Sequence, residues 1–142
     1  MKEARRFSFT TIDPRLGDTS YRPMLSIRLA RQDRSIVAEG LLDSGATVNV
    51  MPYHLGLALG ARWEEQQVVV HLSGNLAELE ARALLVLAAV EPFAPVTQAF
   101  AWTQSTDVPL ILGQVNFFQA FDVYFFRSEL AFEIRPKGAF PQ

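Results

Sequence analysis

The chain lacks cysteine entirely, and it also lacks any long run of apolar residues. The first absence excludes disulfides and thiolate metal sites and favours a reducing compartment. The longest apolar run, residues 83–90, is far shorter than the roughly 20 residues of a membrane-spanning helix. No basic and then apolar leader opens the chain, so no signal peptide is expected. These absences predict a cytoplasmic protein with no membrane partner.

The chain also has no large excess of either charge, because it contains 13 basic and 15 acidic residues and its net charge is −2. Nucleic-acid-binding domains usually carry a basic patch, whereas here only the N-terminus is locally basic. The two histidines, His54 and His71, lie far apart and have no acidic residue or cysteine at metal-ligand spacing. Glycine-rich phosphate loops are absent too. We therefore expect no nucleic-acid partner, no metal and no cofactor.

The composition that remains is that of an ordinary globular protein, with 49% hydrophobic and 20% charged residues. A chain of 142 residues is long enough to bury a core and short enough to form one domain. The prediction is a single domain over residues 1–142. Within it, residues 1–22 are expected to form an N-terminal arm and residues 136–142 a loose C-terminal tail.

Alternating apolar and polar residues predict strands along most of the chain, as in residues 24–30. Further strands are predicted over residues 7–10, 35–42, 68–72, 76–87, 96–102, 108–113, 122–126 and 130–134, and residues 83–90 are expected to be buried on both faces. Short helices are predicted over residues 52–59 and 115–120. The aromatic block of residues 117–126 is assigned to core packing, with a dimer interface as the alternative. The fold class is therefore all-β, a closed sheet with one or two short helices.

One segment is unusual, because the apolar strand that ends at Leu41-Leu42 is followed at once by Asp43-Ser44-Gly45. An ionised carboxylate loses solvation beside a buried strand, so it must be paired, hydrogen-bonded or protonated. Ser44 donates and accepts through one hydroxyl, and Gly45 lets backbone approach closely. On its own the triplet is more typical of a capped turn or a helix N-terminus than of a catalytic loop.

A second motif, Leu110-Ile111-Leu112-Gly113, lies downstream, just before the second predicted helix. In this order, with a hairpin segment between them, the two motifs resemble those of the retropepsin-like aspartic proteases. That family has two hydrophobic residues before Asp-(Thr/Ser)-Gly-Ala, and later an apolar pair followed by Gly. The resemblance covers about residues 24–135. It implies a closed acid-protease barrel with one or two short helices and a flap, a hairpin that folds over substrate, at residues 68–87.

The resemblance also implies an activity, the hydrolysis of peptide bonds by an aspartic endopeptidase acting on a peptide or protein. This chemistry needs two carboxylates that share one proton around one water molecule, and the chain offers one such triplet. The implied partner is therefore a second copy, in a homodimer whose two Asp43 residues meet at a two-fold axis. The resemblance assigns catalysis to Asp43, Ser44 and Gly45. It assigns substrate binding to Ala46, Thr47, Leu72, Ser73, Gly74 and Asn75, and a structural motif to Leu112, Gly113 and Asn116.

Two positions depart from the pattern of many viral members. Those proteins carry an Asp four residues after the catalytic one and an Arg directly after the second-motif Gly, whereas this chain has the neutral residues Thr47 and Gln114. Hydrogen bonds are expected here in place of the viral ion pair. The predicted flap tip, residues 72–75, also has a single Gly. These departures keep a second interpretation open, a dimeric peptide-binding or assembly module that retains the fold and does not cut.

Overall fold

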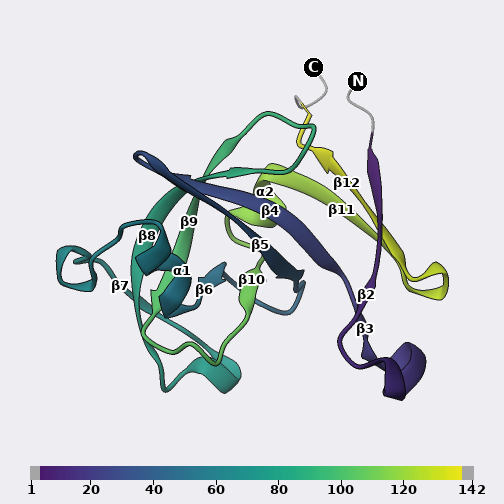
Figure 1. Cartoon of the computed structure of the whole chain (residues 1–142), viewed down its shortest axis with the longest axis horizontal. Helices are drawn as coiled ribbons and strands as arrows, with labels where there is room; N and C mark the ends of the chain where they lie inside the picture. The colour runs from purple at the N-terminus through teal and green to yellow at the C-terminus, as the bar shows by residue number, and fades with distance from the viewer. Residues whose placement is uncertain (1–3, 139–142) are drawn as a thin grey trace.

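In the computed structural model, which describes residues 4–138, six strands close into a barrel (Figure 1). Their hydrogen-bonded order is β4-β5-β10-β6-β9-β8, and β4 pairs again with β8 to complete the ring. Strand β7 extends the sheet along the first residues of β8. The bounds are β4 Met24–Arg31, β5 Arg34–Leu42, β6 Val50–Met51, β7 Val69–His71, β8 Glu80–Ala89, β9 Val96–Thr103 and β10 Leu110–Leu112.

Helices are few and short, which confirms the predicted fold class. They are α1 Tyr53–Ala58 and α2 Phe117–Ala120, with 3-10 segments at η1 Pro14–Ser20, η2 Trp63–Glu65, η3 Gly74–Leu76 and η4 Arg127–Glu129. Of these, η1 is kinked at Gly17. Both predicted helices are present and slightly shorter than expected. Across residues 4–138, none of the helices has the length and apolar character needed to cross a membrane.

One face of each barrel strand fills the interior. In β4, Leu25, Ile27 and Leu29 are at most 1% exposed, while the residues between them face outward or are only partly covered. This is the alternation between faces that strand geometry imposes. The largest fully buried side chains include Trp102, Phe100, Phe117, Phe121 and Phe132. Because burying one such side chain contributes about 1.5–3 kcal/mol, the inward face determines the register of the strands.

The two sequence motifs come together because β5 and β10 are parallel neighbours. Their register pairs Leu110 with Gly40 and Leu112 with Leu42. Parallel neighbours end at the same edge of a sheet. The residues that follow β5 and those that follow β10 therefore lie side by side, although they are far apart in the sequence (Figure 1).

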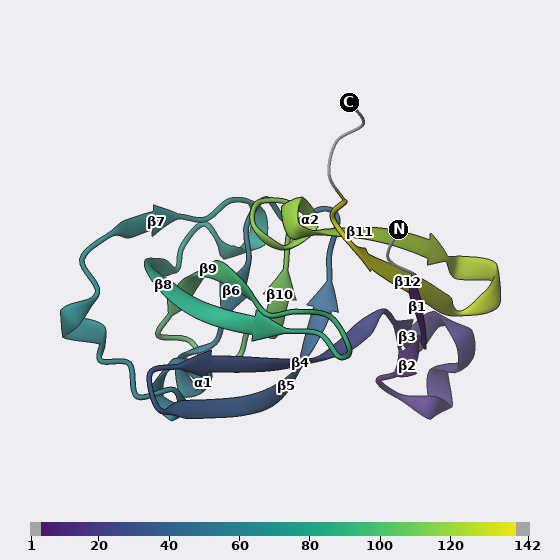
Figure 2. The ribbon, with the colours of Figure 1, turned by 90° about the horizontal axis from the view of Figure 1, so that it is seen from above.

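A second sheet, of order β1-β12-β11, brings the two ends of the described chain together (Figure 2). Its strands are β1 Arg5–Ser8, β11 Phe121–Phe126 and β12 Ala131–Pro136, and a two-stranded sheet pairs β2 Thr10–Thr11 with β3 Tyr21–Arg22. The predicted arm is thus a structured element built from β1, β2, η1 and β3. The predicted tail begins at Pro136, the last residue of β12, and its residues 139–142, like residues 1–3 of the arm, lie outside the described residues.

Two details of the sequence prediction are wrong. Residues 83–90 are not buried on both faces, because the outward side of β8 meets solvent and leaves Leu85 and Leu87 63% and 44% exposed. The prediction of a tight hairpin turn at Gly74-Asn75 is also wrong. Strand β8 begins only at Glu80, and residues 72–79 form a longer loop around η3 because its leucines turn inward to pack.

Candidate active site

Asp43 lies where β5 ends, at the start of a loop that we call the Asp43 loop, residues 43–49. It follows the buried Leu42 and is itself half-buried. One carboxylate oxygen, Oδ1, accepts the Gly45 N–H at 2.9 Å, and the Asp43 carbonyl accepts the Ala46 N–H at 3.1 Å. These bonds close a tight turn that presents the carboxylate at the end of the strand. Within residues 4–138, Asp43 forms no ion pair.

The second motif is joined directly to the Asp43 loop. The Asp43 N–H donates to the Leu112 carbonyl at 3.0 Å, which carries the pairing of β5 and β10 one residue further. Gly113 then passes against the loop at very close range. A Cβ at this position would lie 2.5 Å from the Val48 carbonyl oxygen and 3.0 Å from that of Ala46. The approach is possible only because Gly113 has no side chain.

Hydrogen bonds also join the two neutral positions of the motifs to the loop. Gln114 donates from its backbone N–H to the Ala46 carbonyl at 2.9 Å and from Nε2 to the Ser44 carbonyl. The Val115 N–H donates to the Thr47 carbonyl at 2.8 Å. Gln114 thus adds one side-chain hydrogen bond to the two backbone hydrogen bonds that join the second motif to the Asp43 loop. The Ser44 hydroxyl makes no hydrogen bond within residues 4–138.

The buried side chain of Asn49 holds the end of the Asp43 loop by hydrogen bonds. It was not singled out from the sequence. Asn49 is 0% exposed. Its Oδ1 accepts the Gly113 N–H at 2.8 Å, and its Nδ2 donates to Gln98 Oε1 at 2.9 Å and to the Ala99 carbonyl at 3.1 Å. The signal was present in the sequence as a single amide inside the apolar run of residues 48–51, since a buried amide must find partners.

The network continues through a second buried amide to Asn116. Gln98, which is 2% exposed, donates from Nε2 to the Asn116 carbonyl at 3.1 Å, and Asn116 Oδ1 accepts the Ala99 N–H at 3.0 Å. Asn116 has a φ of 80° and caps α2 together with Gln119. It therefore links the second motif to β9, consistent with a structural position.

A cavity of about 470 Å³ opens over the Asp43 loop. The predicted site residues that line it are Asp43, Gly45, Ala46 and Thr47 from the Asp43 loop and Leu72, Ser73, Gly74 and Asn75 from the β7–β8 loop. Four others do not line it, namely Ser44, Leu112, Gly113 and Asn116. The structure thus brings the predicted catalytic and substrate-binding segments to one space and places the predicted structural motif behind it.

The β7–β8 loop is held against this cavity by its leucines. They pack on a small apolar cluster that is separate from the main core of the barrel. The loop residues are Leu72, Leu76 and Leu79, and the buried members of the cluster are Val50, Val108 and Ile111. Leu76, Val50 and Ile111 also line the cavity, so its walls are largely apolar around a single acidic group.

Asp43 is the one carboxylate among the described residues that line the cavity. Within residues 4–138 there is also no group of three His, Cys, Asp or Glu side chains arranged to hold a metal ion. His54 and His71 are both exposed, and neither lines the cavity. A pair of carboxylates at this site would therefore require an acidic residue from outside the described residues.

Comparison with known proteins identifies the fold. No family model and no curated protein sequence matches the chain. Among solved structures, a retropepsin-like aspartic protease from Rickettsia conorii matches 94% of this chain and 93% of its own, with a TM-score of 0.57 at 10% identity. EIAV protease complexed with the inhibitor HBY-793 matches 66% of this chain and 82% of its own, with a TM-score of 0.48 at 18% identity. The first of these likenesses shows that the chain has a retropepsin-like fold.

Proposed function

We propose that this protein is an aspartic endopeptidase that acts as a homodimer. The observation that carries the proposal is the cavity in which Asp43, at the end of a barrel strand, faces the β7–β8 loop. In a chain with a retropepsin-like fold, that loop would serve as the flap. Ser44 and Gly45 complete the loop, and Thr47 and Asn75 offer polar groups to a bound peptide backbone.

Asp43 of each subunit would supply one carboxylate of a dyad that shares one proton. The ionised carboxylate takes a proton from water while the water oxygen attacks the scissile carbonyl carbon, and the protonated one hydrogen-bonds the carbonyl oxygen. The tetrahedral intermediate then collapses, the C–N bond breaks, and the carboxyl group that took the proton from water gives it to the leaving amine. Because two close carboxylates cannot both stay ionised, the rate should be highest at acidic to mildly acidic pH.

Strand β11 supports the homodimer, because one of its edges is free. It pairs with β12 on one side and with no strand on the other within the described chain. Its Tyr124 and Phe125 are each 41% exposed. Figure 2 shows β11 and α2 along the same side of the molecule as β7. Two copies that joined their β11 edges about a two-fold axis would form a continuous sheet.

The substrate would lie extended through the cavity, paired by main-chain hydrogen bonds to the Asp43 loop and the β7–β8 loop. The walls formed by Val50, Leu76 and Ile111 favour apolar side chains next to the scissile bond. We therefore expect cleavage between or beside apolar residues in unfolded or extended protein segments.

The test is the cleavage of an unbiased peptide mixture by the wild type and Asp43→Asn, followed by mass spectrometry from acidic to neutral pH. The wild type should cut best below neutrality and be suppressed by a statine-type inhibitor. Asp43→Asn should fold normally and lose roughly a thousandfold or more of the rate, because the dyad loses its base. Asp33→Asn, in the exposed turn after β4, is the matched control and should remain active. A fully active Asp43→Asn protein would end the proposal.

The hydrogen-bonded seam at Ser44 and Gln114, with no ion pair, favours one alternative, a dimeric module that binds peptides without cutting them. A wild type that is shown to be dimeric, binds the peptide mixture and cuts none of it would select this alternative.

A further inference from the structure

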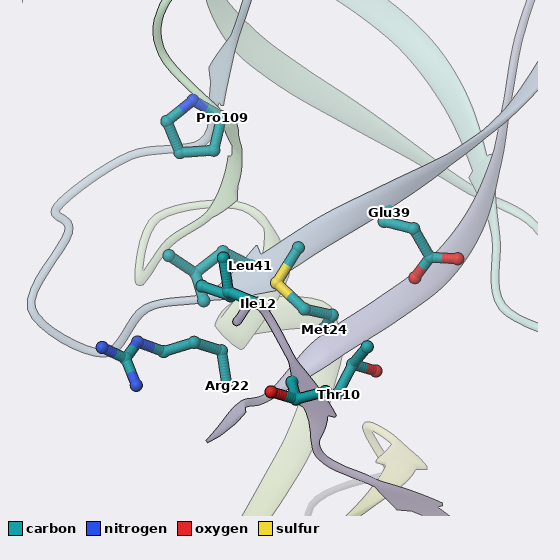
Figure 3. Close-up of a pocket in the computed structure, with 8 residues that line it drawn as sticks. Thr10, Ile12, Arg22, Met24, Glu39, Leu41 and Pro109 are labelled. Atoms are coloured by element: carbon teal, nitrogen blue, oxygen red, sulfur yellow. The ribbon is translucent and has the colours of Figure 1, made fainter. Parts of the chain in front are cut away.

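A second groove adjoins the Asp43 cavity, and the two meet at Leu41 and Pro109, which line both. We call it the arm groove, because one of its walls is the β2–β3 hairpin of the N-terminal arm. It has a volume of about 540 Å³. Figure 3 shows its lining, with Ile12, Met24 and Leu41 grouped together and Pro109 beyond them.

On its barrel side, the arm groove is lined by the face of β5 that leads to Asp43. Residues two apart on a strand point to the same side, so Glu39, Leu41 and Asp43 share one face at the end of β5. Met24 of β4 is the cross-strand neighbour of Leu41. A peptide that crosses Asp43 in an extended conformation and passes Leu41 therefore reaches the arm groove without leaving this face.

The arm wall is held in place by its own hydrogen bonds. The Ile12 N–H donates to the Ser20 carbonyl at 3.0 Å, and Thr11 Oγ1 and Ser20 Oγ are 2.7 Å apart. Arg127 Nη2 donates to the Asp18 carbonyl at 2.8 Å, which ties the arm to the turn before β12. On this fixed backbone the Ile12 side chain is 68% exposed. The arm thus presents the Ile12 side chain to the groove. Most of this side chain is left uncovered by the described residues.

Charged groups of both signs border the apolar part of the arm groove. The Arg22 guanidinium donates only to main-chain carbonyls, those of Thr19 at 2.6 Å and Tyr21 at 2.9 Å. Glu39 is exposed and forms no ion pair within residues 4–138. In Figure 3, Arg22 and Glu39 lie on opposite sides of the Met24 and Leu41 side chains. Both charges remain available to a ligand.

We propose that the arm groove binds the substrate peptide away from the scissile bond and selects an apolar side chain there. The proposal rests on the proposed function. Leu41 lies two residues from Asp43, about 6–7 Å along an extended strand, so the selected side chain belongs to a residue roughly two to four positions from the cut. An acidic residue of the peptide would pair with Arg22 and a basic one with Glu39.

The experiment uses two pools of ten-residue peptides with the same random central residues. The flanking residues are Leu, Phe and Val in one pool and Gly and Ser in the other. The wild type should cut the apolar-flanked pool on the order of tenfold faster in kcat/KM, the size expected for one filled apolar subsite. Ile12→Asp should abolish this preference and leave the cleavage of the Gly/Ser-flanked pool unchanged. Leu16→Asp is the matched control, because Leu16 is an arm residue of similar exposure, 61%, that does not line the groove.

Binding of the same pools to Asp43→Asn protein separates this proposal from the proposed function. If the wild type cuts neither pool, a binding preference for apolar flanks that Ile12→Asp removes still supports the arm groove, whereas equal binding overturns it. A preference that survives Ile12→Asp also overturns it. So does a shift in oligomeric state with Ile12→Asp but not with Leu16→Asp, because the groove would then belong to a contact between copies.

Discussion

Single residues behind the Asp43 loop determine whether Asp43 is held in place. Asn49 is the most important of these, because it joins three backbone segments from a fully buried position. Its partners lie on the second motif and on β9. Loss of this side chain would leave the Gly113 N–H and Gln98 Oε1 without these hydrogen bonds in the interior.

We predict that Asn49→Ala lowers the free energy of unfolding by about 2–4 kcal/mol, because buried polar groups lose their hydrogen bonds. Urea denaturation followed by circular dichroism measures this change. Asn75→Ala, in the exposed β7–β8 loop, is the control and should change stability by less than about 0.5 kcal/mol. Equal effects of the two substitutions would show that Asn49 does not organise the loop.

Asp13 gives a pH-dependent prediction for the arm. Its carboxylate accepts Arg15 Nε and Nη2, each at 2.9 Å, and the Arg15 N–H at 3.1 Å. The Arg15 side chain first, and then its backbone N–H, lower the pKa of Asp13 below the ordinary value. A lowered folded-state pKa means that this contribution to stability is complete above the ordinary Asp value and is lost as the pH falls through the lowered one.

The arm should therefore keep its structure at the mildly acidic pH at which the proposed dyad would work. In an NMR titration, the Arg15 amide signal should move with a midpoint below about 3.9, the ordinary value for Asp. Asp13→Asn should remove that transition and leave the signals of the barrel unchanged. A midpoint at or above the ordinary value would contradict the hydrogen-bonded turn.

At the scale of elements, β11 has one edge that pairs with no strand within the described chain. Edge strands are often protected by lysine or proline, and β11 contains neither. Its one acidic residue, Asp122, is paired with Arg135 at 3.0 Å. The aromatic block of residues 117–126 was assigned to the core from its sequence, and only part of it lies there. Phe117 and Phe121 are buried, whereas Tyr124 and Phe125 are each 41% exposed.

We predict that Phe125→Lys weakens the homodimer at least about tenfold, because a lysine at an edge strand opposes the addition of another strand. Sedimentation velocity over a range of concentrations measures the dissociation constant. Leu85→Lys is the control, since Leu85 is also exposed but lies on the outward side of β8 in the barrel. An unchanged dissociation constant for Phe125→Lys would place the dimer contact elsewhere.

The elements also show what the sequence could and could not reveal. Apolar patterns predicted the barrel strands except β6, and two local motifs predicted that residues after β5 and β10 would form one site, since each signal is contained in a short stretch. The Asn49 and Gln98 contact joins distant segments, so no local pattern contains it. The length of the β7–β8 loop was missed for the same reason, because Leu72, Leu76 and Leu79 are placed by their packing on Val50, Val108 and Ile111.

At the scale of the whole molecule, one chain supplies half of the proposed site. Among residues 4–138, Asp43 supplies the one carboxylate that lines the cavity, whereas the proposed reaction needs two. Activity should therefore depend on the concentration of dimer and not simply on that of protein. This dependence separates the proposed enzyme from any hydrolase whose active site is complete within one chain.

The most direct measurement mixes wild-type protein with increasing amounts of Asp43→Asn protein, allows the subunits to exchange, and follows cleavage of one identified peptide. If the dyad takes one Asp43 from each copy, mixed dimers are inactive. An equal mixture at fixed total protein should then retain about a quarter of the wild-type rate, the share of dimers with two wild-type subunits. Retention of about half the rate after exchange has been verified would mean that each wild-type chain works alone, and would contradict a dyad shared across the homodimer.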